Sequence, residues 1–154
     1  MNPQDEFYSF LQDYAEFLED MVKQEQEKLA ALVSNELVRI EHSITVQQAT
    51  AMKFDNMEQK RLKLQAQAGF QGLSFSEIID QVAVEEQSAL QLIFKRIQQA
   101  LDQIKFYNTK SMNVVRTHIN LSKTAADNQV SQAYGYSKDQ EATGPWTSLL
   151  EKKI

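Results

Sequence analysis

Apolar side chains recur every three or four positions along the first part of the chain. This spacing places them on one stripe of a helix. The stripe is interrupted by Ser34 and Asn35, two residues that favour helix caps over helix interiors. The pattern therefore predicts a first helix over residues 4–33, followed by a tight turn or kink. The stripe consists of Phe7, Phe10, Leu11, Tyr14, Phe17, Leu18, Met21, Val22, Leu29, Leu32 and Val33.

Two further helical stretches follow. A weaker stripe predicts a second helix over 36–68, which ends at the glycines of Gly69-Phe-Gln-Gly72. Next, Ser74 and Glu77 have the spacing of a capping box, and Leu73 and Ile78 flank them as a hydrophobic staple. From Phe75 onwards an apolar stripe continues past residue 119 without a helix breaker, which predicts a third helix over 75–130.

The fold class follows from these stretches and from the positions of the prolines. Pro3 and Pro145 are the only two, and a proline inside a helix costs about 3 kcal/mol. We expect an all-α fold: an antiparallel long-helix bundle or coiled coil of about three helices, in one domain over 1–131. The third helix is the longest, so its far end should lack a partner helix and leave Val114, Val115, Ile119 and Leu121 as an uncovered apolar stripe.

Residues 132–154 form a predicted flexible tail. The segment 123–148 is rich in polar residues and glycine, which predicts a mobile linker. Leu149, Leu150 and Ile154 then return as a short apolar group, too short to persist as a helix alone. Trp146 belongs to no stripe, and either it folds back on the body or it anchors a partner.

Composition and residue spacing argue against several classes of function. The net charge is −5, with no clustered basic face, and this argues against nucleic acid. There are no cysteines, and no apolar run is long enough to insert in a membrane, so we expect a cytoplasmic protein.

His42 and His118 lack the Glu-x-x-His spacing of di-iron bundles, and no metal or other cofactor is expected. One enzymatic interpretation, a phosphatase-like pair of Asp55 and Gln59, is better explained as a solvated helix face. We therefore expect a binding protein and not an enzyme.

The order of these parts resembles the FlgN-like flagellar type III export chaperones. Four passages carry the resemblance: the first connection, 26–41; the charged run 57–64 that ends the second helix; the stretch from Asn108 to Val115; and the ending, from Tyr134-Gly135 to Ser148–Ile154. The family has a second asparagine where this chain has Ser111.

The resemblance implies a chaperone that binds the helical termini of hook–filament junction proteins (hook-associated proteins of the FlgK and FlgL type), prevents their premature assembly and delivers them to the cytosolic domain of the export-gate protein FlhA. We expect two groups of substrate-binding residues: Asn108, Met112, Val114, Val115, Ile119 and Leu121 in the third helix, and Leu149, Leu150 and Ile154 in the tail. Tyr134, Tyr136 and Trp146 are candidates for docking at the gate. The alternative is a structural coiled-coil or bundle adaptor, in which the helices form the interface and the tail is idle.

Overall fold

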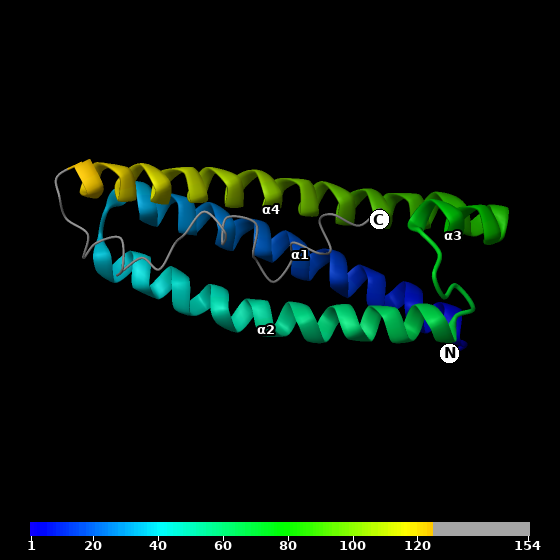
Figure 1. Cartoon of the computed structure of the whole chain (residues 1–154). Coiled ribbons are helices and arrows are strands. Elements are labelled where there is room, and N and C mark those ends of the chain that lie inside the picture. The colour runs from blue at the N-terminus through cyan, green and yellow to red at the C-terminus, as the bar shows by residue number, and fades with distance from the viewer. Residues whose placement is uncertain (125–154) are drawn as a thin grey trace.

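A computed structural model describes the chain over residues 1–124, with side chains described as far as residue 121. Over this range every regular element is a helix, which confirms the all-α fold (Figure 1). The elements are α1 (Pro3–Ser34), α2 (Leu37–Gln67), α3 (Phe75–Gln81) and α4 (Val84–Thr124).

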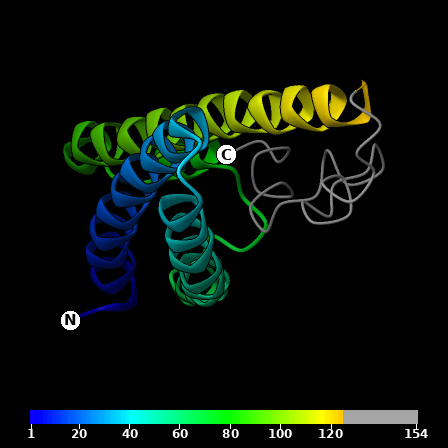
Figure 2. The ribbon, with the colours of Figure 1, turned by 90° about the vertical axis from the view of Figure 1, so that its left-hand side faces the viewer.

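The long helix α1 lies between the other two long helices. It packs against both α2 and α4, whereas no Cα atoms of α2 and α4 in the described part of the chain approach within 8 Å of each other. α2 runs back along α1 as the second arm of a hairpin, and α4 passes across this hairpin (Figures 1 and 2). The side of α1 that faces between α2 and α4 therefore has a helix on each flank.

Local capping explains where α1 begins and ends. The side chain of Asn2 accepts a hydrogen bond from the backbone N–H of Asp5 at 2.8 Å, and Pro3 occupies the first turn, where its missing donor does no harm. At the other end Asn35 takes the left-handed conformation (φ 59°) and closes the helix. The turn predicted at Ser34 and Asn35 is confirmed.

The main core lies along the predicted stripe of α1. Burying one large aliphatic or aromatic side chain contributes about 1.5–3 kcal/mol, so this row supplies most of the stability of the fold. α4 contributes the facing row, and α3 is fixed to α4 by the stacked rings of Phe75 and Phe94, whose centroids are 4.0 Å apart. Members of this core with the least exposure are Phe7, Leu11, Tyr14, Ala15, Leu18, Ile78, Ile97, Leu101 and Ile104.

A buried polar network joins α2 to α1 and to the connection 68–74. Tyr14 donates its hydroxyl hydrogen bond to Glu58 at 2.9 Å, and Glu58 also pairs with Arg61. Gln65 accepts from Arg61 at 2.7 Å and donates to the backbone oxygens of Phe70 and Leu73 at 3.0 and 2.9 Å. Every hydrogen-bonding atom of the Gln65 amide thus has a partner, which fixes the path of the connection.

The third predicted helix is interrupted, and the prediction of one helix over 75–130 is wrong at this point. Ser74 caps α3 as predicted, because its side chain accepts from the N–H of Glu77 at 3.2 Å. Val82 then turns to an extended conformation (φ −83°, ψ 161°), although no proline or glycine is present. The side-chain amide of Gln87 donates to the backbone oxygen of Ile79 at 3.1 Å and thereby replaces a helical donor. Residues 125–130 lie outside the described part.

Candidate functional site

Contacts between α1 and α4 fix the register of the bundle. Tyr8 bonds to Glu86, Glu19 to Arg96 and Lys28 to Asn108, pairs that are 78, 77 and 80 residues apart in the chain. The two helices therefore run parallel with an offset of nearly 80 residues. Because α3 is a separate helix of seven residues, α4 is displaced by about two helical turns from the register of a helix that begins at residue 75.

This displacement brings the far half of α4 against the α1–α2 turn. Val115 and Ile119 are only 4% and 6% exposed and pack with Ala31, Leu32 and Ile40, a group that we call the satellite core. The expectation that the stripe has no partner in its own chain is therefore wrong for Val115 and Ile119. Val114 packs at the edge of this core, and Leu121, 64% exposed, lies beyond it.

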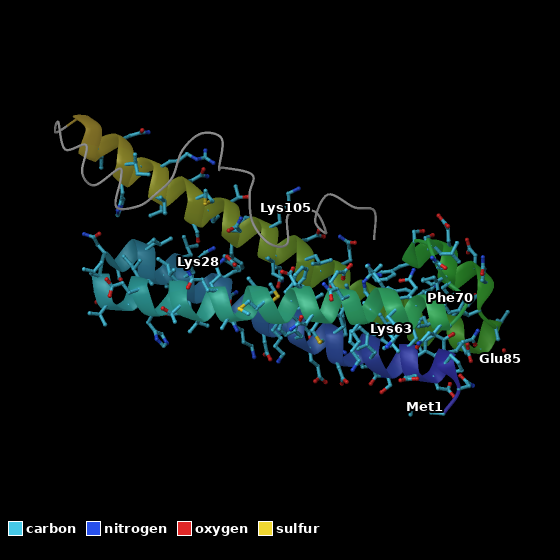
Figure 3. The ribbon with its side chains drawn as sticks, turned by 60° about the horizontal axis from the view of Figure 1, so that its bottom comes forward. Met1, Lys28, Lys63, Phe70, Glu85 and Lys105 are labelled. Atoms are coloured by element: carbon cyan, nitrogen blue, oxygen red, sulfur yellow. The ribbon has the colours of Figure 1, made fainter. Side chains whose placement is uncertain are left out.

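A pocket of about 50 Å³ lies between α2 and α4, with α1 as its floor. We call it the α2–α4 pocket. Figure 3 shows Lys28 on the α1–α2 hairpin, next to the part of α4 that follows Lys105, and Lys28 bonds to Asn108 there. The pocket is lined by Lys28 and Leu32 of α1, by Ile40, Ser43, Ile44 and Gln47 of α2, and by Ser111, Met112 and Val115 of α4.

Polar side chains from all three long helices form a layer at one side of this pocket, and Lys28 and Gln47 of this layer line the pocket itself. Lys28 pairs with Glu25 at 2.7 Å and donates to the side-chain oxygen of Asn108 at 3.0 Å. Gln47 donates to the other oxygen of Glu25 at 3.1 Å. Burial raises the pKa of the Glu25 carboxyl above its ordinary value, and the nearby Lys28 opposes this rise only in part.

Two hydroxyl groups in the pocket wall have no hydrogen-bond partner. Ser43 and Ser111 are 7% and 2% exposed, and the oxygen of each is buried without a donor or acceptor beside it. A buried hydroxyl without a partner is unfavourable, because it has lost its hydrogen bonds to water and gained none. A wider, shallower hollow on α1 and α4, around Leu92 and Arg96, has no such group among the described residues.

The predicted binding residues are distributed over this region in different ways. Met112 and Val115 line the pocket, and Asn108 belongs to the polar layer at its side. Val114 and Ile119 belong to the satellite core. The α2 side of the pocket was missed by the sequence reasoning, because the apolar stripe of α2 is weak. Ile40 and Ile44, one turn apart in that stripe, were the signal that could have indicated it.

The predicted tail residues lie outside the described part of the chain. These are Tyr134, Tyr136, Trp146, Leu149, Leu150 and Ile154.

Other chemistry finds little support in the described residues. Asp55 and Gln59 are both exposed on α2, as expected for a solvated face. Within residues 1–124, histidine, aspartate and glutamate side chains do not gather in groups of three or more that could hold a metal ion. Among the described helices, none has an apolar stretch of the length that crossing a bilayer requires.

Comparison with known proteins identifies a family. The family model described as FlgN protein matches residues 1–144, which is nearly the whole chain. Neither the curated proteins nor the solved structures provide a match.

Proposed function

We propose that this chain, which belongs to the FlgN family of flagellar export chaperones, binds a terminal helix of a hook–filament junction protein in the α2–α4 pocket. By covering that helix it keeps the junction protein from assembling in the cytoplasm, and it then delivers its cargo to the export gate. The family is one of chaperones and not of enzymes, so binding and release are the whole of the proposed activity.

The observation that carries this proposal is the separation of α2 and α4 above α1. Helices pack with their axes about 8–10 Å apart, and α2 and α4 keep their Cα atoms beyond 8 Å from each other throughout the described part. An added helix that lies over the pocket contacts both of them and turns the local arrangement into four helices. Amphipathic helices bind to apolar grooves in this way.

The side chains at the mouth of the pocket suit such a partner. Ile44 is 45% exposed on α2, and Met112 is half-buried on α4. Methionine has a flexible, polarisable side chain that adapts to partners of different shape. Val114 and Leu121 extend the apolar surface along α4, whereas Val115 and Ile119 support it from below.

The tail has two proposed roles. Leu149, Leu150 and Ile154 add affinity for the cargo. A segment that orders on contact gains free energy by burying apolar side chains, and the loss of conformational entropy on ordering offsets part of that gain. One of Tyr134, Tyr136 and Trp146 docks on the cytosolic domain of FlhA, where a large aromatic side chain is a suitable anchor. The family membership supports both roles.

Calorimetric titration of a purified junction protein tests the proposed function. We expect Ile44→Asp and Met112→Asp each to weaken binding at least about ten-fold, since a charge placed against the apolar face of a bound helix is costly to desolvate. Leu92→Asp is the matched control, because Leu92 is 66% exposed and lies on α4 away from the pocket. Helicity should be unchanged in all three variants. Unchanged affinity in both pocket variants would refute the proposal.

A second candidate, a structural adaptor, is favoured by one observation. Val33, Leu37 and Val38 are 67%, 68% and 80% exposed around the α1–α2 turn. Exposed aliphatic groups this close together are typical of interfaces. Sedimentation at increasing concentration distinguishes the two functions: an adaptor forms an oligomer that Val38→Asp disrupts, whereas the proposed chaperone keeps its cargo affinity in that variant.

A further inference from the structure

We infer that Ser43 and Ser111 make the α2–α4 pocket selective for a helix with one uncharged hydrogen-bonding side chain within its apolar face. This inference rests on the proposed function, because it specifies which cargo helix the pocket accepts. The side chain in question is a serine, threonine, asparagine or glutamine of the cargo.

The two serines differ from other hydroxyl residues in the same helices. Ser34 donates to the backbone oxygen of Ala31 at 2.6 Å, and the hydroxyls of Thr45 and Thr117 donate to the backbone oxygens four residues earlier, at 3.0 and 2.9 Å. This local bond is the usual way in which a helical serine or threonine is satisfied. Ser43 and Ser111 are more deeply buried, yet their oxygens have no hydrogen-bond partner.

Both serines line the same pocket, one from α2 and one from α4. A volume of about 50 Å³ admits one small polar group. A helix over the pocket therefore presents one position to both serines. In the free protein the two oxygens have no hydrogen-bond partner, so a bound helix that supplies one gains hydrogen bonds that the chain does not make by itself.

The cargo side chain that lies against the two serines determines which helices the pocket accepts. If the helix is apolar at this position, binding leaves two buried hydroxyls without partners, and such sites discriminate strongly against ligands that lack the polar group. If the side chain is charged, it must be desolvated in a pocket whose charged lining residue, Lys28, already has an ionic partner, which is also unfavourable. The nearest charges, Lys28 and Glu25, already form an ion pair with each other. The side chain that suits the pocket is therefore an uncharged one that can both donate and accept a hydrogen bond.

The test combines variants of both partners. In a peptide of the terminal helix of a junction protein, each serine, threonine, asparagine and glutamine is replaced by alanine in turn. Each peptide is titrated against the wild-type chaperone and against Ser43→Ala/Ser111→Ala. At one position, we expect the alanine peptide to bind wild type about ten-fold more weakly and the double variant less than about two-fold more weakly. Thr45→Ala/Thr117→Ala is the control and should behave as wild type.

The double variant should also bind the unmodified peptide about ten-fold more weakly, while its thermal midpoint does not fall. If no peptide position couples to the serines, or if the double variant binds the unmodified peptide as wild type does, the inference is wrong. The Ile44→Asp variant separates this failure from failure of the proposed function. Binding that is lost in Ile44→Asp but kept in the serine variant overturns the selectivity alone, whereas binding kept in both overturns the pocket as the cargo site.

Discussion

Truncating Val115 and Ile119 to alanine tests whether the far half of α4 packs on its own chain. In the structure both side chains are buried in the satellite core, against Leu32 and Ile40 at the α1–α2 turn. If instead they formed a free stripe, their removal would leave the stability of the protein unaltered. Leu121→Ala is the matched control, since Leu121 lies on the same end of α4 and is exposed.

The expected magnitude follows from the atoms removed. Val→Ala deletes two carbon atoms and Ile→Ala three, and each buried carbon group is worth about 0.8 kcal/mol. This gives about 1.6 kcal/mol for Val115→Ala and about 2.4 kcal/mol for Ile119→Ala. The cavity left behind adds little here, because the pocket and the nearby helix ends allow the neighbours to relax. The double variant should therefore lose about 4 kcal/mol of packing free energy, and the control less than about 0.5 kcal/mol.

Amide hydrogen exchange is the suitable assay, because the satellite core can open without global unfolding. Amides at residues 111–119 of α4 should exchange faster in the double variant by the factor that corresponds to its lost free energy. Urea unfolding followed by circular dichroism gives the global value. If both measurements agree with the wild type within about 0.5 kcal/mol, the satellite core does not hold α4 and the register described above is wrong.

Three further predictions concern other parts of the molecule. Gln65→Met removes the side-chain donor to the Leu73 carbonyl and the acceptor of the buried Arg61, so the free energy of unfolding in urea should fall by about 2–4 kcal/mol; a loss below about 1 kcal/mol would show that the connection is held otherwise. The pKa of Glu25 is raised in the folded state, so at a pH between its ordinary and its raised pKa the folded protein binds more protons than the unfolded one. The free energy of unfolding therefore falls as pH rises through that range. Glu25→Gln should abolish this slope in a series from about pH 4 to pH 8, and an unchanged slope would assign it to other groups. A chain that ends at Gly144 should keep its helicity and thermal midpoint but bind the junction protein more weakly, and calorimetry that finds equal affinity would exclude the tail from cargo binding.

Local signals in the sequence were sufficient for most of the helix boundaries. Ser34 and Asn35 end α1, and Ser74 caps α3, because capping depends on a few neighbouring residues and hardly on the rest of the fold. The stripe of α1 likewise predicted the main core. These features are local, so one sequence is enough to find them.

The interruption at Val82 could not be predicted in this way. Valine, alanine and glutamine are all compatible with a helix interior, and the apolar period continues through Val82. The helix ends there because Gln87 supplies a donor to Ile79 and because Val82 is buried after the chain turns. Neither cause is visible in the apolar period, and contacts of this kind override helix propensity.

The candidate site was predicted only on its α4 side, for the same reason. The position of α4 along α1 depends on the interruption, and without it Val115 and Ile119 are expected to lie beyond the bundle. The α2 side depends on which face of a weakly amphipathic helix points to α1, and Ser43 does not stand out in the sequence from any other serine. Only the packed structure brings it to the same pocket as Ser111.

Binding of a junction-protein helix in the α2–α4 pocket is tested most directly by site-specific photocrosslinking. A photoreactive phenylalanine derivative is placed in turn at Ile44 and Met112 in the pocket wall, and at Val38 and Leu92, which are exposed elsewhere. On irradiation with the junction protein, we expect covalent adducts from Ile44 and Met112, mapped by mass spectrometry to a terminal helix of the cargo, and none from Val38 or Leu92. Adducts from Val38 or Leu92 in the absence of adducts from the pocket would contradict the proposed site.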